Sequence, residues 1–147
     1  MAPRLIVVGV DGSDESREAL RWALEEARLR DATLRAVYAW RDPYVLAPGF
    51  GLPEDFEFDA LRERAVETLG AVVAEVVGAQ SDVSVEEVVA EGPAGSVLVQ
   101  AAEDADLLIV GSRGHGGFVG LLLGSVSQQC VSHAPCPVLV VRARHSG

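Results

Sequence analysis

The sequence predicts an α/β fold in which one open, doubly wound parallel sheet of five strands has helices on both faces. Short runs of β-branched and aliphatic residues alternate along the chain with longer segments whose apolar residues recur every three or four positions. The first run, Leu5 to Val8, is apolar without interruption, which is typical of a strand buried on both faces of a parallel sheet. With 147 residues, 49% of them hydrophobic, the chain is expected to form a single domain over residues 1–147.

The N-terminal part is expected to form a strand, a helix and a second strand. The first strand ends in a turn over residues 9–13, where Ser13 or Asp14 can cap a helix whose apolar face continues to about Leu29. Residues 33–40 have the length and the β-forming side chains of a second strand. Residues 41–58 show no period and are rich in proline, glycine and aromatic residues. This is typical either of a lid or binding loop or of a variable surface loop.

The remainder is expected to add three strands and three helices. A helix over residues 59–79 should end near Gly78, and Pro93 stands where the following helix begins. Residues 83–90 alternate polar and apolar side chains at their start, as an edge strand does. The other expected elements are a helix over 96–102, a strand over 107–110, a helix over 125–133 and a strand over 138–141.

The composition excludes several kinds of partner and chemistry. The formal net charge is −10, and all 12 positive side chains are arginine because the sequence contains no lysine. Nucleic acid and anionic membranes are recognised by a basic face, so neither is an expected partner. The missing lysine also excludes a P-loop of the Walker A type and any Schiff-base chemistry.

Targeting signals and cysteine chemistry are not evident. No apolar run approaches the length of a membrane-spanning helix, and the N-terminal run is interrupted too early for a signal peptide, so we expect a cytoplasmic location. Cys130 and Cys136 have neither metal-ligand nor redox spacing, and we expect both to be buried free thiols.

One stretch, Gly111 to Ser127, has the composition of a phosphate site. It reads GSRGHGGFVGLLLGSVS and contains six glycines before the hydroxyl residues that open a helix. Glycines let backbone amides approach a ligand closely, and a helix N-terminus offers unpaired N–H groups to an anion. Ligands of open α/β sheets bind beyond the carboxyl ends of the strands. If the first and fourth strands are neighbours where the strand order reverses, Asp11, after the first strand, is expected on the opposite side of the same crevice.

The spacing inside this glycine stretch distinguishes it from better-known phosphate loops. It lacks both the dinucleotide fingerprint and the Walker lysine, and has instead Gly111, two residues, Gly114, nine residues, Gly124 and Ser125. In this spacing the chain resembles the ATP-binding branch of the universal stress protein family. Further landmarks occur in the family's order, namely Asp11-Gly12-Ser13, Tyr38-Ala39-Trp40, Glu91-Gly92-Pro93 and His133-Ala134-Pro135-Cys136-Pro137-Val138.

The resemblance implies both a topology and a ligand. The sheet would be Rossmann-like with strand order 3-2-1-4-5, as in the adenine nucleotide alpha hydrolases, and ATP would lie in the crevice with Mg²⁺ carried on its phosphates. The residues that match the family's ATP contacts, with their neighbours, are Val10, Asp11, Ala39, Val110, Gly111, Arg113, Gly114, Gly124, Ser125, Val126 and Ser127.

Several of the candidate residues have a simpler interpretation. Asp11, expected near the ribose, can equally be a turn or helix-cap aspartate, and Ala39, expected at the adenine, can be an ordinary strand end. Arg113, the cation expected to offset triphosphate charge, can be a solvated loop arginine, and His115 is more simply an exposed loop residue. Gly124-Ser125 is also a common way to start a helix.

The expected function is that of an ATP-binding regulatory module of the stress response. Hydrolysis needs a positioned water, a base and charge stabilisation, and the glycine stretch offers only Arg113 and His115. The alternatives are a slow ATPase or nucleotide-transfer enzyme that uses Asp11 or His115, and an interaction domain of the same fold that binds no nucleotide. The resemblance also implies a homodimer formed through the last strand, Pro137 to Arg142.

Overall fold

The structure is a computed structural model that describes residues 4–41, 58–78, 81–113 and 123–143. Its elements are β1 (Leu5–Gly9), α1 (Asp14–Arg30), β2 (Thr33–Trp40), α3 (Phe58–Val77), β3 (Val85–Glu91), α4 (Ala94–Ala101), β4 (Leu107–Gly111), α5 (Ser125–His133) and β5 (Val138–Val141). The strands form one parallel sheet in the order β3-β2-β1-β4-β5, which confirms the expected fold class and strand order.

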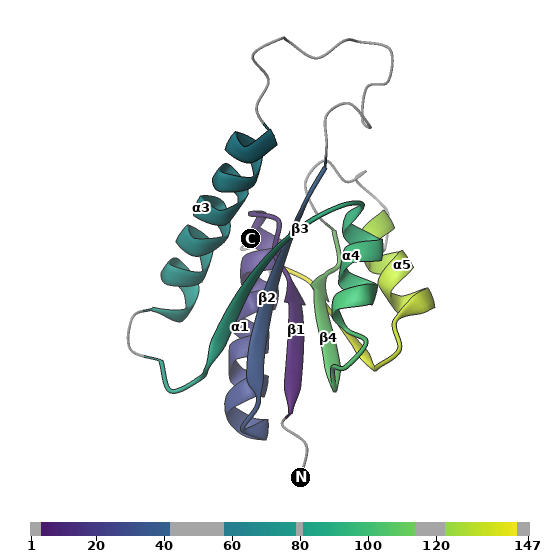
Figure 1. Cartoon of the computed structure of the whole chain (residues 1–147). Coiled ribbons are helices and arrows are strands. Elements are labelled where there is room, and N and C mark those ends of the chain that lie inside the picture. Colours follow the sequence, from purple (N-terminus) through teal and green to yellow (C-terminus); the bar gives the residue numbers. More distant parts are fainter. Residues whose placement is uncertain (1–3, 42–57, 79–80, 114–122, 144–147) are drawn as a thin grey trace, which may run out of the picture.

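The sheet separates two layers of helices (Figure 1). Helices α1 and α3 cover one face, and α4 and α5 cover the other. Alternate side chains of β1 supply the two cores, since Ile6 and Val8 pack with α1 and α3 whereas Leu5 and Val7 pack with α4. This double burial explains why the strand is apolar without interruption.

Local signals set most element boundaries as expected. Ser13 caps α1, and its side chain accepts a hydrogen bond from the backbone N–H of Ser16. Strand β3 does lie at the sheet edge but begins at Val85, two residues later than expected, and the turn before it is closed by the Ser81 hydroxyl, which accepts from the Val83 amide. Helix α4 begins at Ala94, directly after its N-cap Pro93, where the sequence placed the start of this helix.

Other expectations are met in part or fall outside the described residues. Cys130 is buried, as expected, whereas Cys136 is only partly buried. Nearly all of the 41–58 loop lies outside the described residues. Within the part of the chain that the structure describes, no helix has the length and apolarity to cross a membrane.

Candidate functional site

The two segments that the sequence singled out leave the sheet from neighbouring strands. β1 pairs with β4 in the centre of the sheet, and the chain order reverses between them. Such a switch point is where open α/β sheets bind ligands. We call residues 10–13, after β1, the first lip, and residues 111–113 together with 123–127, after β4, the second lip.

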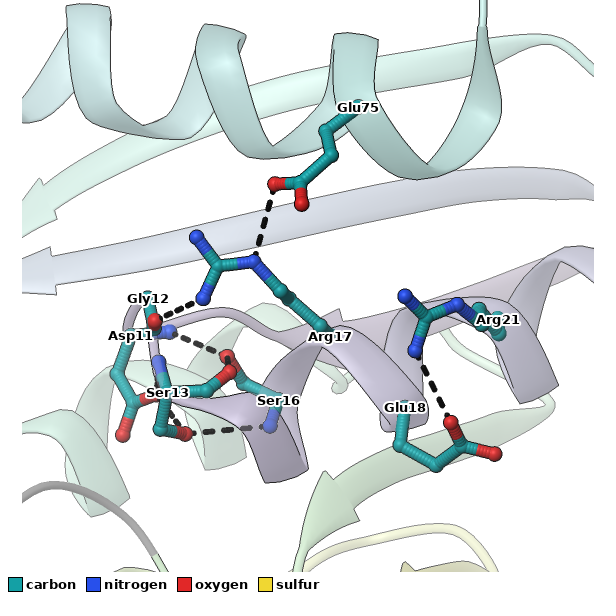
Figure 2. Close-up of polar contacts among 8 residues, drawn as sticks. All are labelled: Asp11, Gly12, Ser13, Ser16, Arg17, Glu18, Arg21 and Glu75. Carbon is teal, nitrogen blue, oxygen red and sulfur yellow. Dashed lines mark hydrogen bonds and ion pairs between the residues drawn. The ribbon is translucent and has the colours of Figure 1, made fainter. Parts of the chain in front are cut away.

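The first lip is a tightly closed turn (Figure 2). The Oδ1 atom of Asp11 accepts hydrogen bonds from the backbone N–H of Ser13, at 2.9 Å, and from its hydroxyl. The Ser16 hydroxyl accepts from the Asp11 amide and donates to the Ser13 carbonyl, while Gly12 adopts a φ of 84°, which favours glycine. Asp11 therefore does form the turn, and that turn holds its carboxylate at the switch point.

An arginine that the sequence analysis did not single out supports this lip. Arg17, one turn into α1, donates from Nη1 to the Gly12 carbonyl and from Nε to Glu75 of α3, at 3.0 Å (Figure 2). Its side chain is 27% exposed, so the ion pair is only partly shielded. Helix α3, which lies on the same face of the sheet as α1, is thereby connected to the first lip.

The second lip joins the two ends of the glycine stretch. The Ser112 amide donates to the Val141 carbonyl of β5, and the Ser112 carbonyl accepts from the Gly124 amide at 2.6 Å. The buried Ser127 hydroxyl donates to the carbonyls of Ser112, at 2.8 Å, and Gly124, at 3.0 Å. The Ser127 hydroxyl thus connects the two ends of the glycine stretch, with its single proton shared between the Ser112 and Gly124 carbonyls.

Helix α5 begins at this closure without a side-chain cap. Its N-cap is Gly124, which provides no side-chain hydrogen bond, and Ser125 is exposed. The first amides of a helix lack intrahelical partners and carry the positive end of the helix dipole. The start of α5 is consequently suited to an anion, as the sequence pattern indicated.

A buried carboxylate lies against the second lip, and the sequence analysis missed it. Glu15, in the first turn of α1, is 9% exposed. Its Oε2 accepts from the Ser112 hydroxyl at 2.8 Å and from the Arg113 amide at 2.6 Å, while its Oε1 lies 3.7 Å from the Arg113 Nε. Arg113 is therefore ion-paired with Glu15, although its side chain remains partly exposed. The only local signal for Glu15 is an acidic residue in a first helical turn, which is common.

Close backbone approach accompanies this contact. A Cβ atom added at Gly111 would lie 3.0 Å from the Glu15 Cβ and 3.2 Å from the Glu15 carbonyl carbon. Both distances are shorter than ordinary van der Waals contact, so any other residue at this position would require α1 and β4 to move apart by a few tenths of an ångström.

The remaining candidate residues are distributed along the same edge. Val10 and Val110 are buried, at the ends of β1 and β4, and Val126 packs against the cluster that contains Val110. Ala39 lies near the end of β2, opposite Ala90 of β3, and is partly buried. Gly114 and His115 lie outside the described residues. Of the side chains that the structure does describe, no three His, Cys, Asp or Glu residues are grouped so as to hold a metal ion.

Comparison with known proteins identifies the family. The model of the universal stress protein family matches residues 3–142. The chain belongs to the universal stress protein family. A universal stress protein of Mycobacterium tuberculosis is 37% identical over 138 residues, which are 93% of this chain but 44% of that protein, so the chain spans about half the length of the curated relatives it matches.

Two solved structures of universal stress proteins are described as nucleotide complexes. One, in complex with cAMP, is 28% identical with a TM-score of 0.61, covering 97% of this chain and 98% of that one. The other, from Archaeoglobus fulgidus in complex with dAMP, is 27% identical with a TM-score of 0.66, covering 96% and 99%. Relatives of this chain therefore include proteins that bind adenine nucleotides.

Proposed function

We propose that this chain binds ATP between its two lips and acts as a nucleotide-binding regulatory module of the stress response in the cytoplasm. The observation that carries the proposal is the uncapped start of α5, brought by the Ser112–Gly124 closure to the switch point beside Asp11. Family membership and the adenine nucleotides of its structural neighbours support an adenine nucleotide as the ligand.

In this proposal each lip binds one end of the nucleotide. The amides that open α5, with the exposed Ser125 hydroxyl and the Gly111, Gly114 and Gly124 backbone, receive the phosphates, and Mg²⁺ is carried on those phosphates. Asp11 accepts from the ribose hydroxyls. The adenine meets the backbone at Ala39. Val10 and Val110, buried at the ends of β1 and β4, and the half-buried Val126 are its proposed apolar neighbours.

Ser127 and Arg113 have more limited parts in the proposed site. The Ser127 hydroxyl donates to two loop carbonyls, so its contribution is to hold the α5 amides in place. Arg113 remains the one cation of the glycine stretch, but its guanidinium lies against Glu15. Since the chain has no lysine, charge stabilisation for phosphoryl transfer is weak, which favours binding over efficient hydrolysis.

A homodimer through β5 is the proposed assembly. β5 is an edge strand with four apolar residues, three of them only partly buried. An unpaired apolar edge is removed when two such strands pair. Sedimentation at micromolar concentration tests this, with a monomeric mass as the contradicting result.

Calorimetric titration of the purified protein with Mg-ATP tests the nucleotide proposal. Ser125→Ala and Asp11→Asn should each lower the affinity for ATP by about tenfold, because each removes a polar group proposed to contact the ligand. Ser132→Ala, an exposed position at the other end of α5, is the matched control and should bind as the wild type does. Absence of binding at millimolar ATP contradicts the proposal.

The same samples separate binding from hydrolysis. Release of phosphate from ATP is followed over hours for the wild type and for Asp11→Ala. Turnover that is lost in Asp11→Ala while ATP still binds favours the slow ATPase. A chain that copurifies with no nucleotide and binds none in the titration is instead an interaction domain of this fold.

A further inference from the structure

Glu15 accepts from donors at the second lip that adjoin those proposed to receive the phosphates. Its two carboxylate oxygens are contacted by the Ser112 hydroxyl, the Arg113 amide and the Arg113 guanidinium, all at the start of the glycine stretch. The side chain is 11% exposed, so water does little to screen its charge. The carboxylate thus occupies the position of an internal anion beside the proposed phosphate site.

The charge of this carboxylate has few cations to offset it. Arg113 is the only arginine of the glycine stretch, and the whole chain lacks lysine. Arg17, which approaches the first lip, is already paired with Glu75 and bonded to the Gly12 carbonyl. A phosphate chain that enters between the lips therefore competes with Glu15 for Arg113 and meets the negative charge of Glu15 as well.

We propose that Glu15 is a specificity-determining residue of the nucleotide site, whose fixed charge withholds Arg113 and disfavours a polyphosphate chain unless a divalent cation neutralises it. This inference rests on the proposed nucleotide binding at the two lips. It predicts a site in which the two additional phosphates of metal-free ATP add little affinity beyond that of AMP, whereas those of a metal-bound triphosphate add more. The penalty grows with each added phosphate because each adds negative charge near the same carboxylate.

The wild-type protein provides the first test. Calorimetric titration in EDTA should show metal-free ATP binding no more than about twofold tighter than AMP, although ATP has two more phosphates to contact the loop. Addition of Mg²⁺ should tighten ATP at least fivefold and leave AMP unchanged. Metal-free ATP that binds tenfold tighter than AMP overturns the inference without any variant.

Glu15→Gln is the second test, because glutamine keeps an acceptor oxygen for Ser112 and the Arg113 amide but loses the charge. In EDTA the variant should bind ATP about tenfold and AMP about twofold more tightly than the wild type. Glu26→Gln is the matched control, since Glu26 is also ion-paired on α1, with Arg30, and lies about 16 Å further along the helix. It should change neither affinity.

A double-mutant cycle then tests whether Glu15 acts by withholding Arg113. Arg113→Ala should lower the affinity for metal-free ATP at least threefold more in the Glu15→Gln background than in the wild type, because the guanidinium reaches the phosphates only after the carboxylate charge is removed. Equal losses in the two backgrounds overturn this part of the inference.

The outcomes separate this inference from the proposed function. If the wild type and Glu15→Gln bind none of the nucleotides, the proposed function fails and the inference fails with it. If the wild type binds nucleotide and Glu15→Gln leaves the ratio of ATP to AMP affinity unchanged, the inference alone fails. A ratio that falls in Glu15→Gln also contradicts it, since Glu15 would then support polyphosphate binding.

Discussion

The two lips of the candidate site are held in different ways. The turn of the first lip is closed by hydrogen bonds among residues no more than five positions apart, from Asp11 to Ser16. Its two longer connections are the Val10 amide, which donates to the Val37 carbonyl of β2, and Arg17, which pairs with Glu75 of α3. The second lip depends on distant segments, since Ser112 contacts Val141 of β5 and Glu15 of α1, the latter 97 residues away in the sequence. The turn of the first lip is therefore closed mainly by local contacts, whereas the second lip depends on contacts that exist only in the folded domain.

Mutations in the two lips are therefore expected to differ in how far their effects reach. A change in the first lip should affect one turn and one helix start. A change in the second lip should affect the packing of α1 against β4 and the start of α5, and with it the stability of the domain.

Gly111→Ala should have the largest effect, because its new methyl group would lie 3.0 Å from the Glu15 Cβ and 3.2 Å from the Glu15 backbone. We expect the free energy of unfolding to fall by about 2 kcal/mol and the affinity for ATP by about tenfold. Urea denaturation and calorimetry measure these two quantities.

Gly70→Ala is the matched control for this substitution. Gly70 lies inside α3, and among the residues that the structure describes a Cβ added there meets only the Glu87 Oε1, at 3.4 Å. Alanine should raise the free energy of unfolding by about 0.5–1 kcal/mol, since glycine is unfavourable inside a helix. Equal losses of unfolding free energy in Gly111→Ala and Gly70→Ala would show that the close approach of Gly111 to α1 is not the cause of the destabilisation.

Ser127→Ala should have the next largest effect, because it removes the buried hydroxyl that joins the Ser112 and Gly124 carbonyls. We expect a loss of about 1.5 kcal/mol in the free energy of unfolding. Ser125→Ala, two residues earlier and exposed, should change stability by less than about 0.5 kcal/mol and yet weaken ATP binding. If Ser125→Ala were the more destabilising variant, the assignment of the two hydroxyls would be reversed.

Ser13→Ala tests the local nature of the first lip. It removes both the N-cap of α1 and the hydroxyl donor to Asp11, and should cost about 1 kcal/mol. Ser13→Gly should cost only a few tenths of a kcal/mol, because glycine is tolerated at an N-cap. Both variants lose the hydroxyl that holds Asp11, so both should weaken ATP binding alike. Weakening by alanine alone would show that the capped helix start matters more than the aspartate contact.

The parts of the fold with local causes could be predicted from the sequence. The bounds of β2, α5 and β5 agree with the expected ranges, and the starts of α1 and α4 follow from Ser13 and Pro93. The pairing of β1 with β4 followed from the family resemblance, since periodicity alone leaves the strand order open.

The parts of the site with distant causes could not be predicted. Glu15 looks like an ordinary acidic residue of a first helical turn, and nothing in the sequence relates it to Ser112 or Arg113. From the sequence, the Ser127 hydroxyl is as compatible with contacting a ligand as with bonding the loop. Which of the two it does depends on the direction of the Ser112 carbonyl, which accepts from it in the folded chain. Residues within one turn specify a motif, whereas partners on different elements are specified only by the assembled sheet.

The smallest effect is expected on the alkylation rates of the two thiols, Cys130 in α5 and Cys136 after it. These rates report whether α5 stays packed against the sheet. Burial raises the pKa of Cys130 to about 11, with a smaller contribution from Cys136, and burial also raises the pKa of Cys136, aided by Asp106. Because the charged thiolate is the form that burial disfavours, about one Cys130 in a thousand is ionised at pH 8.

Alkylation with iodoacetamide, followed by mass spectrometry, tests this. At pH 8 the folded protein should keep Cys130 unmodified while Cys136 reacts slowly, and both rates should rise toward pH 11. Saturating ATP should change the Cys130 rate less than twofold, since α5 is already anchored by Ser112 and Ser127. Rapid alkylation of Cys130 at pH 8 would mean that α5 opens readily and that the second lip is as loosely held as a local turn.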